Sequence, residues 1–254
     1  MSKQRIAALD YIRGISALGV VGIHTGAYSL SNPQVNIHLF ALLEIVTRFS
    51  VPIFFYVSAF GLFWGYQAGQ PFSYRDFMRR RLRTVLLPYV SWSVLYMIYN
   101  TVTTGNLYLW QPRLLVKYLL FGLASYQLYF LVILLWFYAL MPLWRQLVNF
   151  IIQKPVGRLS WLLIFQIIFN YYSSYKLQPV FGNHFINMAI EYRMSYWLIH
   201  YLFIFLLGAV CAIKYADLTR LLRKYPVYLT GLFAGTLAGM LFFYYYLIFN
   251  RHYT

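Results

Sequence analysis

Seven apolar segments, each about as long as a lipid bilayer is thick, constrain the fold of this chain more than any other feature. An α-helix rises about 1.5 Å per residue, so roughly 20 apolar residues cross a hydrocarbon core of about 30 Å. Backbone polar groups inside lipid must pair within the protein, which favours helices for segments of this length. The sequence therefore predicts an all-α fold, a polytopic transmembrane helix bundle of about seven spans. The segments are 11–30, 41–66, 85–102, 126–144, 159–175, 195–213 and 226–249.

The charged residues indicate how those spans are oriented. Only 10% of residues are charged, and 21 Lys and Arg against 5 Asp and Glu give a net charge of +16. The basic residues lie between the apolar runs, where they suit topology signals and anionic-lipid contacts rather than nucleic-acid binding. A cytoplasmic N-terminus places 14 of them inside and six outside, as the positive-inside rule requires. We therefore expect a multi-pass protein of the cell membrane with its N-terminus in the cytoplasm.

Three polar side chains, Asp10, Arg13 and His24, lie in or beside the first apolar segment. Arg13 and His24 are 11 positions apart, which is almost three whole turns, so a helix places both on one face about 16.5 Å apart along its axis. Asp10 falls near the same stripe. Polar groups in lipid are costly unless they meet a partner or water, so these are candidate functional residues. The alternative is structural: Asp10 and Arg13 pair at the interface, while His24 hydrogen-bonds a neighbouring helix.

A dense basic cluster follows the second apolar segment and consists of Arg79, Arg80, Arg81 and Arg83. Guanidinium groups bind phosphate oxygens in a bidentate manner, so this cluster is a candidate site for a polyphosphate. The alternative is a purely topological role, because positive-inside bias alone explains several arginines.

Two further segments supply candidate cavity-lining residues. Pro52 lies within the second apolar segment, where its missing N–H kinks a helix and frees a backbone carbonyl, and Ser58 follows on the same segment. Gln127 and Tyr129 add hydrogen-bonding groups at the start of the fourth segment, although an aromatic belt also explains that run.

Metal chemistry has no recognisable signature in the chain. The single cysteine, Cys211, excludes an intramolecular disulfide, and His, Cys and carboxylates show no ligand spacing. We expect no metal and no tightly bound cofactor.

The same segments resemble the membrane-bound acyltransferase-3 family, whose members acylate polysaccharides, lipids and antibiotics. The resemblance covers roughly the first 145 residues. It is carried by Leu9–Ala17, by the R-x10-H spacing of Arg13 and His24, by Val51–Phe60, by Arg79–Arg83 with Leu87-Pro88-Tyr89, and more weakly by Leu128–Leu131.

Two substitutions and the number of spans depart from the family pattern. Ala59 replaces a glycine, and Gln127 stands where a histidine is often found. Members of the family have more spans than the seven counted here. We expect residues 1–254 to form a single membrane acyltransferase-like domain that is short at its C-terminal end relative to the family.

The resemblance implies an O-acyltransferase that moves an acyl group, commonly acetyl, from cytoplasmic acyl-CoA to a hydroxyl of a cell-surface polysaccharide, a lipid-linked sugar or a similar acceptor. His24 would be the general base, Asp10 would orient Arg13, and Arg13 with the arginine cluster would hold the anionic donor. Direct transfer and a covalent acyl-histidine both remain open, as does assembly into an oligomer. The alternatives are a glycan flippase or exporter, which needs no acyl-CoA, and a non-catalytic membrane partner.

Overall fold

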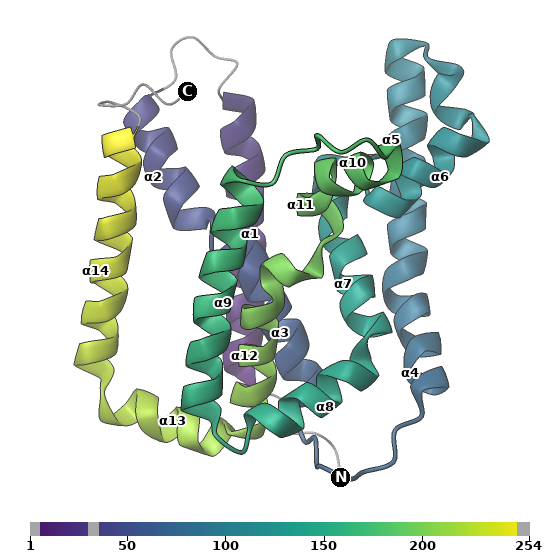
Figure 1. Ribbon diagram of the computed structural model, residues 1–254. Coiled ribbons are helices and arrows are strands. Elements are labelled where there is room, and N and C mark those ends of the chain that lie inside the picture. The colour runs from purple at the N-terminus through teal and green to yellow at the C-terminus, as the bar shows by residue number, and fades with distance from the viewer. Residues whose placement is uncertain (1–5, 30–35, 248–254) are drawn as a thin grey trace. The chain divides into compact units, whose positions relative to one another are not determined.

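The computed structural model describes residues 6–29 and 36–247, and within those ranges it is helical with no β-strand (Figure 1). The predicted all-α fold is therefore confirmed. The chain divides into two compact units, residues 1–66 with 207–254 and residues 67–206. Each is described by itself.

The first unit holds α1 (Ala7–Ser29), α2 (Ile37–Thr47), α3 (Ser50–Phe63), most of α12 (Leu202–Ile213), α13 (Tyr215–Lys224) and α14 (Pro226–Tyr245). The second unit holds α4 (Tyr74–Arg81), a π-helix η1 (Leu82–Leu86), α5 (Leu87–Thr104), η2 (Leu107–Trp110), α6 (Pro112–Phe121), η3 (Tyr126–Leu128), α7 (Tyr129–Ala139), α8 (Met141–Ile151), α9 (Pro155–Tyr175), α10 (His184–Glu191), α11 (Arg193–Tyr196) and η4 (Leu198–Tyr201).

Three stretches of the described chain are helical, long and apolar enough to cross a membrane: His38–Phe63, Tyr74–Thr104 and Pro226–Tyr245. Two pairs of helices are sharply bent at a short break, and each pair adds one span if it is counted as a single span. The pairs are Pro112–Phe121 with Tyr126–Ala139, and Leu198–Ile213 with Tyr215–Lys224. By length and composition the described helices thus supply three to five spans. The seven spans and the cytoplasmic N-terminus stay predictions.

The predicted break in the second apolar segment is present, at Arg48 and Phe49 between α2 and α3. A proline ring clashes with the carbonyl four residues before it and provides no N–H for that carbonyl. Pro52 is the third residue of α3, so the affected carbonyl belongs to Arg48. The position of the break follows directly from the proline.

Small residues let α1 pack closely against α2 and the start of α3. A Cβ added at Gly19 would lie 2.0 Å from Oγ of Ser50, and one added at Gly22 would lie 3.2 Å from Cγ2 of Thr47. Such close approach through small residues is characteristic of helices packed inside membranes. This packing fixes the position of α1 along α2 and the start of α3.

The same unit contains a second close contact, between α3 and α12. A Cβ added at Gly208 would lie 2.3 Å from the carbonyl oxygen of Tyr56. At the end of α3, Phe60 and Trp64 pack edge-on against Tyr215, the first residue of α13, with ring centroids 5.8 and 5.1 Å apart. These contacts place the start of α13 beside the C-terminal end of α3.

The second unit is held together by aromatic packing and by long-range hydrogen bonds. Phe137 on α7 stacks on Phe205 with ring centroids 4.0 Å apart, and both side chains are fully buried. The hydroxyl of Tyr89 donates to the carbonyl of Leu119, 2.5 Å away and 30 residues later in the chain. This bond ties α5 to α6, which folds back beside the end of α5 (Figure 1).

Candidate functional site

Asp10 and Arg13 lie one turn apart near the start of α1 and form an ion pair. Nη1 of Arg13 donates to Oδ1 of Asp10 at 3.2 Å, and the two side chains are 49% and 35% exposed. Arg13 also lies against α3, because a Cβ added at Gly61 would be 3.8 Å from its Nη2. The carboxylate therefore orients a guanidinium that still faces solvent or a ligand.

His24 lies further along the same helix and is partly buried. His24 follows Arg13 by eleven positions of unbroken α-helix, so the two side chains share a face about 16.5 Å apart along the axis. The glycine stripe that packs on α2 lies on roughly the opposite face of α1. The helix α1 is not among the described stretches that are long and apolar enough to cross a membrane, so the first span stays a prediction.

The helix α3, which packs against α1, contains two serines, Ser50 and Ser58. Ser58 is partly buried, three residues before Gly61, which contacts Arg13. Ser50 is fully buried beside Gly19, and its Oγ has no hydrogen-bond partner among the described residues. The first unit thus holds Asp10, Arg13, His24 and Ser58, with Arg13 beside Gly61, about one helical turn from Ser58.

The arginine cluster lies in the second unit, on α4 and η1, and its members differ in environment. Arg79, Arg80 and Arg83 are exposed and fall within about 100° of one another around the helix. Arg81 turns the other way, with its guanidinium 5.4 Å from the ring centroid of Phe77 and 5.1 Å from that of Tyr138. The four-arginine phosphate site stays a prediction, and within it Arg81 differs from the other three because its guanidinium packs on aromatic rings.

The π-helix immediately after this cluster has a local cause. Pro88 has no N–H and cannot tolerate an ideal carbonyl four residues earlier, so the backbone widens over Leu82–Leu86 before α5 begins. Such bulges often occur at functional sites. Here the bulge contains Arg83 and lies inside Tyr74–Thr104, a stretch long and apolar enough to cross a membrane.

Gln127 and Tyr129 are engaged by neighbouring side chains of the second unit. Nε2 of Gln127 donates to the hydroxyl of Tyr96 at 2.6 Å, and its Oε1 accepts from Oγ of Ser125 at 2.6 Å. The hydroxyl of Tyr129 has a side-chain hydrogen bond with Tyr201. Both ends of the Gln127 amide therefore serve local structure.

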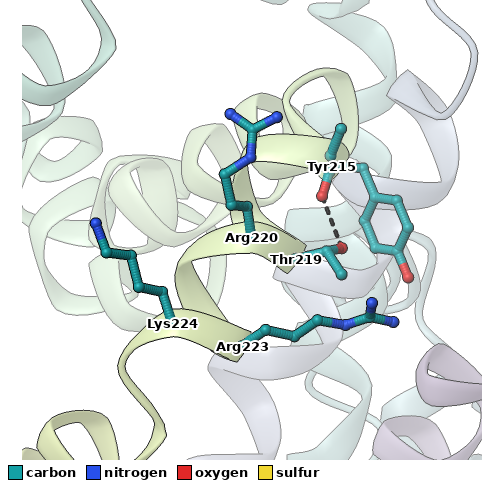
Figure 2. A pocket seen from close by; sticks show the side chains of 6 residues that line it. Tyr215, Thr219, Arg220, Arg223 and Lys224 are labelled. Atoms are coloured by element: carbon teal, nitrogen blue, oxygen red, sulfur yellow. Dashed lines mark hydrogen bonds between the residues drawn. The ribbon is translucent and has the colours of Figure 1, made fainter.

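A basic pocket on α13 was not predicted as a site from the sequence. Among the described residues, an open pocket of about 730 Å³ is lined by α13, and Figure 2 shows Tyr215, Thr219 and Arg223 along one side with Arg220 and Lys224 on the other. The opposite face of this helix carries exposed leucines, Leu221 and Leu222. An apolar face opposite clustered cations is typical of a helix lying in the membrane interface. The spacing of these residues was visible in the sequence as amphipathic periodicity.

A buried polar cluster in the second unit was also missed. The two ring nitrogens of His200 lie 3.2 Å from Oγ of Ser173 and 3.1 Å from Oδ1 of Asn170, and Nε2 of Gln166 donates to the same Asn170 oxygen. Oε1 of Gln166 accepts from the backbone N–H of Phe203. Ser173 is fully buried, so it has no room for a substrate. The cluster attaches η4 and the start of α12 to α9 by hydrogen bonds.

No group of three or more His, Cys, Asp or Glu side chains able to hold a metal ion occurs in the part of the chain that the structure describes.

Comparison with known proteins decides the class of the chain. A family model described as an acyltransferase domain, that of the acyltransferase-3 family, matches residues 6–254. The chain belongs to the acyltransferase-3 family. No curated protein and no solved structure matches it.

The family assignment covers more of the chain than the motif resemblance did, because it extends through α14 to residue 254. The protein is an acyltransferase that transfers groups other than aminoacyl groups, and its apolar helices agree with a membrane location. The candidate residues fall into two sets. Asp10, Arg13, His24 and Ser58 lie in the first unit, whereas Arg79, Arg80, Arg81, Arg83, Gln127 and Tyr129 lie in the second.

Proposed function

We propose that this acyltransferase is a multi-pass enzyme of the cell membrane that moves an acetyl group from cytoplasmic acyl-CoA to a hydroxyl of a glycan or a lipid-linked acceptor. The observation that carries the proposal is the arrangement of α1, where Arg13 and His24 share one face of an unbroken helix about 16.5 Å apart. A donor with its phosphates at one end and its thioester at the other suits two groups separated in this way.

His24 is the proposed general base. A neutral imidazole near pH 7 can take the proton of the acceptor hydroxyl while the oxygen attacks the thioester carbonyl, and the CoA thiol then leaves with that proton. His24 lies well along α1, and the proposal requires this part of the helix to exclude the bulk water that would compete with the acceptor.

Arg13 is proposed to hold the donor by charge. Its guanidinium donates to Asp10 and remains about half exposed, so it has N–H groups for a phosphate as well. Asp10 acts through Arg13 as a positioning residue, because its Oδ1 fixes the direction of the guanidinium.

The exposed arginines of α4 and η1, in the second unit, are proposed as an alternative site for the phosphates of the donor. Arg79, Arg80 and Arg83 offer three guanidinium groups on one face, which suits a ligand with several phosphate oxygens. The pocket on α13 is the competing basic site, because Arg220, Arg223 and Lys224 line it.

The first experiment tests His24 in the purified protein reconstituted into vesicles. His24→Ala should lower acetyl transfer from acetyl-CoA by about 10²-fold or more, the usual contribution of a general base, while calorimetry shows donor affinity unchanged. His184→Ala, at an exposed histidine of α10, is the matched control and should behave as wild type. Unchanged transfer in His24→Ala would remove His24 from the mechanism, and joint loss of binding would make its role structural.

A second experiment separates the two basic sites. Replacing Arg79, Arg80 and Arg83 by Gln should weaken acetyl-CoA binding by about tenfold or more, and added salt should reduce the difference from wild type. The matched variant replaces the three cations of the α13 pocket in the same way. Loss of binding only in the second variant would assign the donor to α13, and glycan binding without acetyl-CoA binding in the wild type would favour an exporter.

A further inference from the structure

A groove between α2 and α14 in the first unit is unrelated to the residues assigned to catalysis. Its volume is about 450 Å³, and its walls are the apolar side chains of Ile45 and Phe49 on one side and Phe233, Leu237 and Met240 on the other. The break between α2 and α3 lies at this groove, because Arg48 and Phe49 both line it. Its walls carry one charged group.

That charged group is Arg48, and its height in the membrane follows from α14. The hydroxyl of Tyr244 donates to Oε2 of Glu44, and Tyr245 donates to the carbonyl of His38 at 3.2 Å. These tyrosines end a 20-residue helix, whose length of about 30 Å matches the hydrocarbon core. Glu44 therefore lies at one edge of the core, and Arg48 lies one turn deeper along α2.

Arg48, the C-cap residue that follows α2, lies just inside this edge and is only partly neutralised there. Its Nη2 donates to Oε1 of Glu44, and Glu44 is its ion-pair partner within the described ranges. The side chain is 55% exposed, and a guanidinium has five N–H donors. A half-exposed cation at the edge of hydrocarbon needs an anion or water, because its desolvation is costly. An anion from outside the chain can fill this role.

A second copy of this chain is a poor source of that anion. The chain has 5 Asp and Glu against 21 Lys and Arg, and most of these carboxylates are already engaged. Asp10, Glu44 and Asp217 pair with arginines, and Asp76 accepts from Ser73. The occupant must therefore bring its own negative charge, together with an apolar chain to fill the groove.

We propose that this groove binds one acyl chain of an anionic phospholipid whose phosphate accepts hydrogen bonds from Arg48. The chain would run along the turns of α14 from Met240 toward Phe233, away from the interface. Such a lipid neutralises Arg48 and covers apolar surface of α14, on which no residue is buried by the described part of the chain. This inference does not depend on the acyltransferase mechanism.

The experiment reads the groove itself with a fluorescent label. Cys211 is the single cysteine, so Cys211→Ala with Thr236→Cys carries one bimane label at an exposed position that lines the groove. Delipidated protein in detergent is titrated with phosphatidylglycerol or phosphatidylcholine bearing brominated chains, which quench the label on contact. We expect phosphatidylglycerol to reach half-maximal quenching at a lipid concentration at least about tenfold below that needed for phosphatidylcholine.

Substitutions at the charge and in the groove complete the test. Arg48→Gln should remove the preference for phosphatidylglycerol, whereas Arg48→Lys keeps part of it, and Arg113→Gln, at an exposed arginine of α6, leaves it intact. Leu237→Trp should weaken quenching by both lipids, with circular dichroism confirming the helical fold of each variant.

Four results would overturn the proposal. They are a preference that survives Arg48→Gln, an equal loss in Arg113→Gln, displacement of the lipid by soluble glycerol phosphate at the same concentration, and a groove occupied by a second protomer in lipid-free detergent. The third would show a phosphate site without a lipid chain, and the last an interface between copies.

Discussion

Gly208→Ala tests the closest backbone contact of the first unit. The added Cβ would lie 2.3 Å from the carbonyl oxygen of Tyr56, 2.9 Å from its carbonyl carbon and 3.0 Å from its Cα. All three are backbone atoms, so no rotamer change can relieve the clash. Ordinary contact begins near 3.4 Å, and α3 and α12 must therefore separate by about 1.1 Å along that direction, the difference of the two distances.

The expected cost can be set against the gain from helix propensity. Overpacking a well-packed contact costs about 1–3 kcal/mol, and a clash with backbone falls at the upper end. Alanine is about 1 kcal/mol better than glycine inside a helix. The net loss is therefore about 2 kcal/mol, which lowers the melting temperature of a domain of this size by roughly 4–8 °C.

Thermal unfolding in detergent, followed by the fluorescence of the 7 tryptophans, measures this shift. The matched control is Gly235→Ala on α14, where an added Cβ meets nothing within 4 Å. That variant keeps only the propensity gain and should melt about 1–4 °C higher than wild type. A Gly208→Ala protein that melts at or above the wild-type temperature would refute the close approach of α3 and α12.

Two further predictions concern polar groups. Asp10→Asn should reduce the rate of acyl transfer by less than about fivefold, because an exposed ion pair contributes at most about 1 kcal/mol. Arg13→Gln should reduce this rate far more. Equal losses of the two variants in steady-state kinetics would mean that Asp10 itself contacts the substrate. Asn170→Leu leaves buried polar atoms of Gln166 and His200 without a partner and should lower the free energy of unfolding by about 1–3 kcal/mol. Ser160→Ala, at an exposed position of α9, is its control, and equal melting of the two variants would contradict the structural role of the cluster.

Those features that depend on local sequence were predictable. Every apolar segment lies at least in part on a helix, because apolar length and backbone pairing leave lipid-embedded chain few alternatives. Pro52 fixed the break between α2 and α3 through a clash four residues away. The shared face of Arg13 and His24 followed from helical periodicity alone, and the structure keeps α1 unbroken between them.

Features that depend on packing between distant segments were not predictable. Gln127 is bound to Tyr96, 31 residues earlier, and nothing in either local sequence indicates that pairing. The same limit applies to His200, which meets side chains of α9 that are 27 and 30 residues away. Sequence identified these as polar groups in apolar surroundings, but only the fold shows whether a protein partner satisfies them.

The basic residues show most clearly what the fold adds to composition. The net charge of +16 counts every cation equally, but the cations lie in different environments. Arg81 packs on aromatic rings, Arg13 pairs with Asp10, and Arg48 lines an apolar groove. Each environment changes the cost of the charge, because a cation in water needs no partner whereas one beside hydrocarbon does. Arg48 combines a half-exposed guanidinium with apolar walls, and that combination rather than the number of arginines is what indicates a ligand.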